Sequence, residues 1–301
     1  MDPRALQHFL NLADRLHFGH AAAAAHVSPS ALSRSIRRLE DEVGAELFER
    51  NNRSVSLTHA GKLFLEYARQ ALGNWDAIRA MLMEQSGELH GEISMYCSVT
   101  ASHSFLFDLL TRFRRDHPRV EIKLHTGDPE EAIGRVLAGG EDIAIGARPD
   151  RLPAGLAFRP IAVSPLLFIA AADAFEHLES GVEGRAGANA SHWAGVPMIL
   201  PEAGAARRRA DEWFRALGTP PRIYAQVAGN EAIVSMVSLG FGVGLVPQIV
   251  LDTSPLGDTV RALELRPRLP PLEIGLLALE KRLASPLIGA LWSSPIKPLS
   301  P

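Results

Sequence analysis

Hydrophobic positions change their spacing along the chain, and these changes divide it into regions with different predicted elements. Near the N-terminus, apolar residues recur three or four positions apart, the spacing of one face of an amphipathic helix. From about residue 91, short apolar runs of strand length alternate with helical stretches. Such alternation is typical of parallel sheets covered by helices. The sequence therefore predicts a helical N-terminal domain followed by a larger α/β domain.

The most informative stretch is HFGHAAAAAHVSPSALSRSIRRLEDE, residues 17–42. It predicts a short alanine-rich helix, a tight turn and a second helix. Ser28 and Pro29 begin that second helix, because a serine side chain caps free backbone N–H groups and proline has φ preset for the first helical position. The residues at i, i+4 and i+7 form its buried face: Leu32, Ile36 and Leu39. This is the pattern of a helix-turn-helix.

The opposite face of the second helix carries short hydroxyl and cationic side chains: Ser30, Ser33, Arg34 and Arg37. Near a helix N-terminus, side chains of these kinds suit the base edges and phosphates of a DNA major groove. A surface helix of an enzyme can show the same features, and the motif alone does not decide between the two interpretations.

A short hairpin is predicted directly after the helix-turn-helix. Leu47-Phe48 and the alternating residues 53–57 flank a polar Asn51-Asn52 turn. A hairpin in this position is a wing. Arg50 and Arg53 flank its tip, where we expect them to reach phosphate or an adjacent minor groove.

Thr58 predicts the start of a long helix that runs to about residue 85. Its apolar residues are spaced alternately four and three apart: Phe64, Ala68, Ala71, Trp75, Ile78 and Leu82. A heptad pattern over about 25 residues, roughly 40 Å of helix, is typical of a helix that pairs with another. We expect a dimerising linker, although the same residues can also pack on their own chain.

The remaining sequence predicts two α/β units. The first has strands near 93–99, 120–124 and 143–145, with helices near 105–113 and 132–137. An apolar run at 166–172 begins the second unit, with strands near 196–200, 222–228 and 243–246 and helices near 205–217 and 231–239. A strand at 272–279 returns the chain to the first unit, before a last helix at 286–292. Two such units enclose a cleft at the carboxyl ends of their strands, where open sheets bind ligands.

Charge and cysteine content narrow the class of protein. Because 31 basic and 34 acidic residues give a formal net charge of −3, any DNA contact must be local. The lone Cys97 excludes an intrachain disulfide and a cysteine-based zinc site, and it is consistent with a reducing cytoplasm. Charged residues interrupt the N-terminus, which excludes a signal peptide, and no apolar run is long enough to span a bilayer.

Enzyme motifs are absent from the sequence, and we predict no catalytic residue, metal or cofactor. Gly240, Gly242 and Gly244 form G-x-G-x-G and precede a predicted strand, whereas a dinucleotide turn follows one. The histidines are scattered. A stand-alone solute-binding protein has the same two-unit arrangement, but residues 1–85 would then be unexplained.

Three motifs in this order, HFGHAAAAAHVSPSALSRSIRRLE, LFERNNRSVSLTHAG and GFGVGLVP, resemble the LysR-type transcriptional regulators over essentially the whole chain. The segments CSVTASHSF, FRRDHPRVEIKLHTGD, AARRRADEWF and GNEAIVSMVSLGFGVGLVPQIVLDTSP are similar to the IlvY branch, activators of the acetohydroxy acid isomeroreductase gene of isoleucine and valine synthesis.

The resemblance implies a fold and domain limits. It implies a winged helix-turn-helix at residues 1–58, a linker helix at 59–88 and an effector-binding domain at 89–301, of the periplasmic-binding-protein type. Within the effector-binding domain, we expect lobe 1 at about 91–162 and 267–301 and lobe 2 at about 163–266. The family's DNA contacts fall on Pro29, Ser30, Ser33, Arg34 and Arg53, nearly the set chosen from the residues alone.

Family effectors bind between the lobes, which implies a site at Ser98, Thr100, Ser102 and Thr126. Hydroxyls and free N–H groups at a helix N-terminus accept a carboxylate. The effectors of the IlvY branch are acetolactate and acetohydroxybutyrate, whose oxygens we expect Thr100, Thr126 and Asn230 to bind. Each hydroxyl taken singly is better explained as a helix cap or turn bond; together they favour a site. An aromatic acid is the main alternative ligand.

Arg207, Arg208 and Arg209 form a charge run on a predicted helix. Such a run is usually a solvated face. The alternative is that Arg207, nearest the helix start, pairs with the effector carboxylate.

The resemblance also implies partners: double-stranded promoter DNA, a homodimer or homotetramer, and RNA polymerase. Two departures qualify it. Leu106-Phe107 replaces a common Leu-Pro, so we expect the first sensor helix to enter differently, and the alanines at 21–25 offer few polar groups to a DNA backbone.

Overall fold

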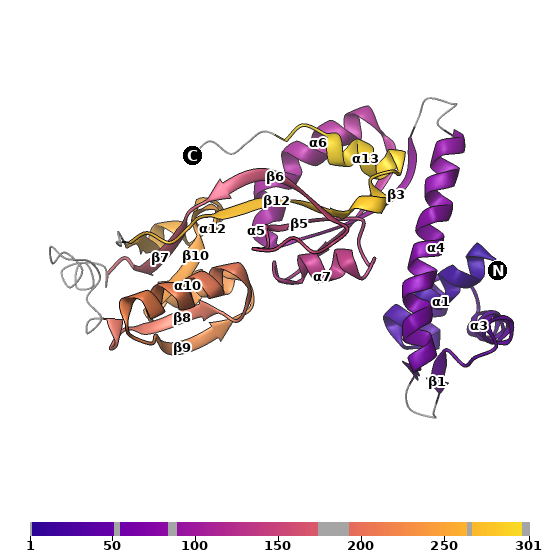
Figure 1. Cartoon of the computed structure of the whole chain (residues 1–301), viewed down its shortest axis with the longest axis horizontal. Coiled ribbons are helices and arrows are strands. Elements are labelled where there is room, and N and C mark those ends of the chain that lie inside the picture. Colours follow the sequence, from indigo (N-terminus) through magenta and orange to yellow (C-terminus); the bar gives the residue numbers. More distant parts are fainter. Residues whose placement is uncertain (1, 51–54, 84–88, 174–192, 264–266, 297–301) are drawn as a thin grey trace.

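A computed structural model describes residues 2–50, 55–83, 89–173, 193–263 and 267–296. The elements form an elongated molecule, with the small helical domain and a long helix at one end and two five-stranded sheets following one another toward the other end (Figure 1). Among the described helices, none is long and apolar enough to cross a membrane.

The N-terminal domain is a winged helix-turn-helix, as the sequence predicts. It comprises α1 (Pro3–Arg15), α2 (Phe18–Ala24), α3 (Pro29–Val43), β1 (Phe48–Arg50) and β2 (Val55–Leu57). The strands β1 and β2 pair antiparallel as the wing. Its core is built by the apolar faces of the helices and β1: Leu6, Phe9, Leu12, Leu32, Ile36, Leu39, Leu47 and Phe48.

The long helix α4 (His59–Met83) begins at the predicted cap. The Thr58 hydroxyl accepts the Gly61 N–H at 2.9 Å and donates to the Glu46 carbonyl at 2.7 Å. This side chain therefore fixes the direction in which α4 leaves the wing.

The prediction of which face of α4 pairs with a second helix is wrong for the first half of the helix. Phe64 and Ala68 are buried in the N-terminal domain, where the Phe64 ring stands edge-on to Phe9 with centroids 4.9 Å apart. The exposed large apolar side chains of α4 are Leu63 and Tyr67, which the heptad pattern did not include, and Trp75 and Ile78, which it did. The side chain of Leu82 lies outside the described residues. Because Phe64 satisfies the helical spacing equally well by packing on its own chain, the heptad pattern did not distinguish the two faces.

The first lobe of the sensor is built on a sheet of order β4-β3-β5-β12-β6. Its strands are β3 (His90–Cys97), β4 (Arg119–Thr126), β5 (Ile143–Ala147), β6 (Leu156–Ser164) and β12 (Leu272–Leu279). β3 is parallel to β4 and β5, whereas β12 is antiparallel to β5 and β6. Its helical segments are α5 (Val99–Ala101), η2 (Ser102–Leu106), α6 (Phe107–Asp116), α7 (Glu131–Leu137), η4 (Glu280–Arg282) and α13 (Pro286–Ser293).

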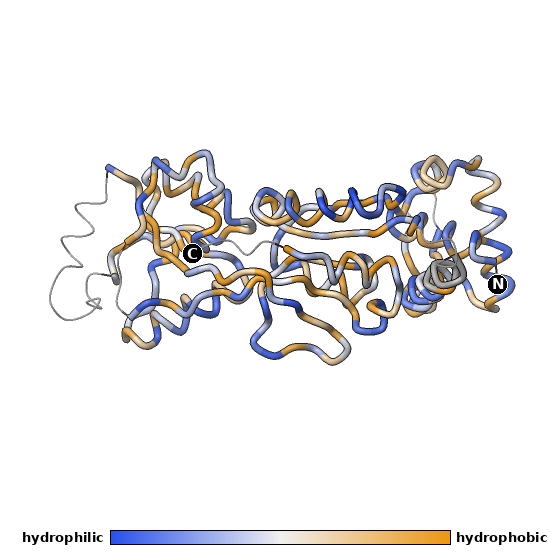
Figure 2. The backbone as a smooth tube through the Cα atoms, turned by 90° about the horizontal axis from the view of Figure 1, so that it is seen from above, coloured by the Kyte–Doolittle hydropathy of each residue, from blue (hydrophilic) through white to orange (hydrophobic). Residues whose placement is uncertain are grey.

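The second lobe is built on a sheet of order β11-β7-β10-β8-β9. It contains β7 (Leu166–Ala171), β8 (Pro197–Pro201), β9 (Arg222–Val227), β10 (Val243–Pro247) and β11 (Val260–Ala262), with α10 (Gly204–Leu217), α11 (Asn230–Ser238), α12 (Gln248–Thr253) and η3 (Gly257–Thr259). Figure 2 shows the coiled segments of the tube alternating between hydrophilic and hydrophobic colours, as expected for helices with one buried face.

The chain passes between the lobes where β6 ends and β7 begins. The Ser164 hydroxyl, buried at this crossing, accepts the Ile249 N–H at 3.2 Å. β8, β9 and β10 are parallel, so their carboxyl ends open toward the first lobe, where the carboxyl end of β3 also lies. This topology places a cleft between the lobes.

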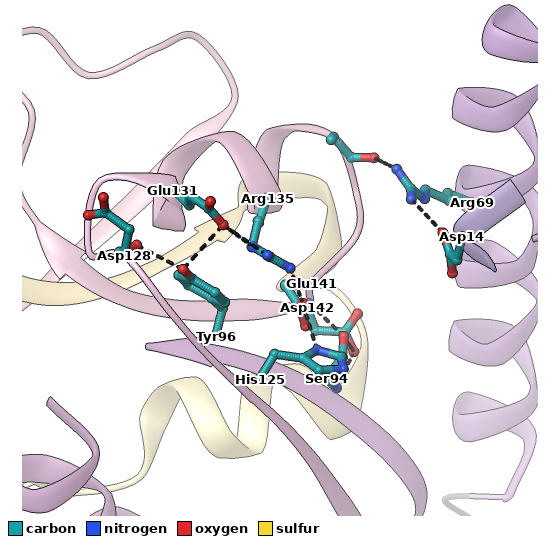
Figure 3. A network of polar contacts seen from close by, with 11 residues as sticks. Asp14, Arg69, Ser94, Tyr96, His125, Asp128, Glu131, Arg135, Glu141 and Asp142 are labelled. Atoms are coloured by element: carbon teal, nitrogen blue, oxygen red, sulfur yellow. Dashed lines mark hydrogen bonds and ion pairs between the residues drawn. The ribbon is translucent and has the colours of Figure 1, made fainter. Parts of the chain in front are cut away.

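The N-terminal domain and the first lobe meet at α4. Arg69 of α4 donates to the Ala138 carbonyl just after α7 at 3.1 Å and pairs with Asp14 of α1 at 3.2 Å (Figure 3). One side chain thus joins the end of α7 to the helix-turn-helix domain.

Candidate DNA interface and effector site

The proposed DNA-reading face lies on α3, opposite the buried leucine and isoleucine side chains. The Ser28 hydroxyl caps the helix by accepting the Ala31 N–H at 3.2 Å, and it lies 3.1 Å from the Ser30 hydroxyl. Among the other expected contact residues, Pro29, Ser30, Arg34 and Arg37 are exposed and Ser33 is half-buried. The first turns of α3 therefore present hydroxyl and guanidinium groups to the solvent, as a recognition helix requires.

The structure describes the contacts of only one of the two wing arginines expected to bind DNA. Arg50 of β1 forms an ion pair with Glu40 of α3, and its guanidinium lies over the Phe18 ring, 5.5 Å from the centroid. The other oxygen of Glu40 accepts the N–H groups of Leu47 and Phe48 at 3.0 and 3.2 Å. Arg50 therefore fastens the wing to α3, and its contact with DNA stays a prediction. Arg53 lies outside the described residues.

A cavity of about 70 Å³ lies between the lobes. Both lobes line it. The first lobe contributes Ser98, Thr100 and Phe105 after β3, the segment Asp128–Glu130 before α7, and Ile145 and Ile274. The second contributes Pro201–Ala203, Val227, Gly229, Asn230 and Ile233. The site therefore combines a few polar groups with aliphatic walls, the composition typical of small-ligand sites.

Three of the expected effector residues reach this cavity. Ser98 is the N-cap of α5, where its hydroxyl accepts the Ala101 N–H at 3.2 Å. Thr100, 5% exposed, donates its N–H at 2.8 Å to Glu231 of the second lobe, and its hydroxyl donates to the same oxygen. Asn230 begins α11 on the opposite wall.

Two expected residues do not line the cavity. The Ser102 hydroxyl donates to the Val99 carbonyl at 2.6 Å, so here the local turn bond is the correct interpretation. Thr126 is exposed at the end of β4. Ser102 also opens the π-helical segment η2, which runs to Leu106 directly before α6.

The expectation that Arg207 faces the effector is wrong. Arg207 turns back into its own lobe, where it pairs with Asp211 at 3.0 Å and donates to Gln226 at 2.7 Å. Arg208 instead reaches across the cleft to Asp150 of the first lobe, at 2.9 Å. The spacing of Asp211 one turn after Arg207 is the sequence signal for the local pair.

Glu130 is a cleft residue that the sequence reasoning missed. Its carboxylate lies against Gly204 and accepts the Ala205 N–H at the start of α10 in the second lobe. Loss of water around the carboxylate, followed by repulsion from Asp128, raises the pKa of Glu130, against the opposing effects of Arg208 and the Ala205 N–H.

A network of polar contacts fixes the segment that carries Glu130 (Figure 3). The Tyr96 hydroxyl donates to the Asp128 carbonyl at 2.8 Å and lies 3.3 Å from Glu131. Arg135 pairs with Glu131 at 2.8 Å and lies over the Tyr96 ring, 4.4 Å from its centroid. Burial and Glu131 raise the pKa of Tyr96 to about 12, so its hydroxyl keeps its proton at neutral pH.

An exposed recognition helix and a polar cleft between two lobes define the class of ligand-responsive DNA-binding regulators. The family model described as "Bacterial regulatory helix-turn-helix protein, lysR family" matches residues 3–62, and "LysR substrate binding domain" matches residues 86–294. The chain belongs to the LysR family of transcriptional regulators, and it is not an enzyme.

Curated relatives place it next to the IlvY activators. The HTH-type transcriptional activator IlvY of Salmonella typhimurium is 44% identical over 97% of this chain and 98% of the relative. The IlvY activator of Haemophilus influenzae is 40% identical over 96% and 97%. The chain is therefore a LysR-type transcriptional activator closely related to IlvY.

Solved structures confirm the fold. A full-length OxyR variant from Pseudomonas aeruginosa aligns over 100% of this chain and 99% of its own with a TM-score of 0.68 at 21% identity. CbnR complexed with its target DNA aligns over 97% of each chain with a TM-score of 0.63 at 22% identity.

Replacing Glu130 with Gln should raise the melting temperature at pH 7 to 8. Because the folded-state pKa lies above the ordinary value of 4.5, the folded protein binds this proton more tightly, and wild-type stability falls as pH rises from 4.5 through the folded pKa. Melting curves from pH 4 to 8 should show the gain shrinking toward acid. The exposed Glu212→Gln is the matched control, and a pH-independent gain in Glu130→Gln would contradict the account.

Cys97 should be unreactive in the native protein. Burial raises the pKa of this thiol to about 11, so little thiolate exists at neutral pH. Iodoacetamide at pH 7.5 should therefore label the folded chain roughly 100-fold more slowly than the urea-unfolded chain. Mass spectrometry measures the rates; comparable labelling of both states would show an accessible thiolate.

Proposed function

We propose that this chain is an effector-dependent activator of the acetohydroxy acid isomeroreductase gene of isoleucine and valine synthesis, with acetolactate or acetohydroxybutyrate as effector. The observation that carries the effector class is the convergence of the N–H and hydroxyl of Thr100, a residue that lines the cavity, on one carboxylate oxygen of Glu231. Two donors aimed at one carboxylate make a site for an organic acid. The close relation to the IlvY activators supports the target gene.

The walls of the cavity support a small branched acid. Asn230 offers an amide to a ketone or tertiary hydroxyl, while Ile145, Ile233 and Ile249 suit methyl groups. The cavity between these walls measures about 70 Å³ with the Glu231 carboxylate on the Thr100 donors.

Two alternatives remain distinct. Another small carboxylate would use the same Thr100 donors and differ only in its remaining contacts. The second alternative is peroxide sensing, because a hydrogen peroxide-inducible genes activator of Dickeya chrysanthemi is 28% identical over 96% of this chain. The single, buried Cys97, with its pKa raised to about 11, disfavours cysteine chemistry of that kind.

The proposed mechanism uses both modules. Paired α4 helices, through the exposed side chains of Leu63, Tyr67, Trp75 and Ile78, hold two recognition helices at half-site spacing on promoter DNA, and sensor contacts assemble a homotetramer in the cytoplasm. The effector changes the lobe arrangement by binding one arrangement more tightly than the other, which alters contact with DNA and RNA polymerase.

Arg34→Ala should weaken binding to the promoter DNA of the target gene roughly 5- to 150-fold while leaving effector affinity unchanged. Removing an exposed guanidinium from the recognition helix costs about 1–3 kcal/mol of DNA binding without touching the sensor. Fluorescence anisotropy and calorimetry measure the two affinities, with the exposed Arg114→Ala of α6 as control. Equal loss of both would contradict separate modules.

Thr100→Val should lower acetolactate affinity at least tenfold while DNA is still bound, because the variant keeps side-chain volume but loses one of two donors. Thr126→Val is the matched control and should bind acetolactate as wild type does, since Thr126 lies outside the cavity. Calorimetry measures the acetolactate affinity of both variants. An unchanged affinity in Thr100→Val would remove Thr100 from the site.

A further inference from the structure

We propose that Glu231 is an internal competitor of the effector: its carboxylate occupies the Thr100 donors in the effector-free protein, and the effector must displace it. We call the contact between Glu231 and Thr100 the carboxylate latch. The proposal rests on the proposed function in one respect, namely that the effector carboxylate binds at Thr100.

The latch crosses the cleft. Thr100 follows β3 of the first lobe, and Glu231 lies in the first turn of α11 in the second lobe. One oxygen of Glu231 accepts both the Thr100 N–H, at 2.8 Å, and the Thr100 hydroxyl. A charged group that receives two donors from the opposite lobe holds the lobes at one separation.

The donors taken by Glu231 are those that an effector carboxylate needs. At the start of the helical segment, Ser98 already binds the Ala101 N–H through its hydroxyl and the Ser102 N–H through its carbonyl. The Thr100 N–H is left for an acceptor from outside the helix, because the first N–H groups of a helix have no partner within it. Two carboxylates cannot share these donors, since like charges at one position repel.

In a second contact between the lobes, the first lobe supplies the carboxylate and the second lobe supplies the N–H group. Glu130 of the first lobe accepts the Ala205 N–H at the start of α10 in the second lobe, beside Gly204. Arg208 and Asp150 add an ion pair between the lobes at 2.9 Å. Each lobe thus supplies an acidic side chain to a helix start of the other.

The cavity borders the latch at Thr100 and the second carboxylate contact at Glu130. About 70 Å³ remains between the lobes while both carboxylates are in place. Release of Glu231 would vacate the Thr100 donors and remove one tie between the lobes. Effector binding would therefore favour the lobe arrangement that lacks the latch. The effector would bind that arrangement more tightly than the latched one.

Hydrogen exchange of the Thr100 amide tests the latch without any effector. In full-length Glu231→Ala this amide should exchange at least tenfold faster than in wild type, whereas the exposed Glu212→Ala should match wild type. Glu231→Gln, which keeps the volume and one acceptor oxygen, should lie between them. Amides of β3 and α10 report whether each variant is folded. An unchanged Thr100 rate in a folded Glu231→Ala overturns the latch.

Calorimetry with acetolactate tests the competition. Glu231→Ala should bind acetolactate at least threefold more tightly than wild type, because no carboxylate has to be displaced. A merely structural contact predicts unchanged or weaker binding, and that result would overturn the competition. If wild type and variant both fail to bind acetolactate, the proposed effector is wrong, while the exchange experiment still decides whether the latch exists.

Discussion

Helix starts carry backbone N–H groups that have no acceptor within the helix, and this constraint shapes both ends of the molecule. At α3 the Ser28 hydroxyl satisfies it, which leaves the neighbouring side chains facing solvent. At the cleft the acceptors come from the opposite lobe, because Glu231 serves the helix after β3 and Glu130 serves α10. The first arrangement leaves a surface ready for DNA, and the second makes lobe closure depend on carboxylates.

The same constraint explains why an organic acid is a suitable signal. A cleft whose donors already bind carboxylates can exchange an internal one for an external one without leaving an N–H group unpaired. In the first lobe, α7 begins directly after Glu130, and the Ala138 carbonyl follows its last residue. Arg69 binds that carbonyl and also Asp14 of the N-terminal domain (Figure 3). A displacement of α7 therefore bears directly on the domain that holds the recognition helix.

Much of the fold was predictable because its elements bury one regular face. The strand at Leu272–Leu279 and the helices that became α3 and α10 follow apolar periodicity, and the Thr58 cap follows hydroxyl chemistry. β6 was not predicted, because Arg159 and Pro160 interrupt its apolar pattern, and β11 is a short edge strand. The heptad residues of α4 misled for a related reason, since periodicity marks a buried face without saying which partner buries it.

The site was only partly predictable. Ser98 and Thr100 line the cavity, as expected, since the topology brings the first helix start to the cleft. We expected Arg207 to face the cleft, but Arg208 is the arginine that reaches the other lobe. A run of three arginines does not show which of them has a partner one turn away. Glu130 and Glu231 escaped notice because acidic residues at helix starts are ordinary on a surface. Only the tertiary structure shows that each reaches the other lobe.

We propose that the cleft binds a small branched hydroxy-oxo acid. The most direct measurement is the melting temperature of the full-length chain with and without millimolar acetolactate, acetohydroxybutyrate, benzoate or muconate. A ligand that binds only the folded state raises this temperature by mass action. We expect a rise with the two acetohydroxy acids alone. A rise only with an acid derived from an aromatic compound, or with none of the four, would contradict it.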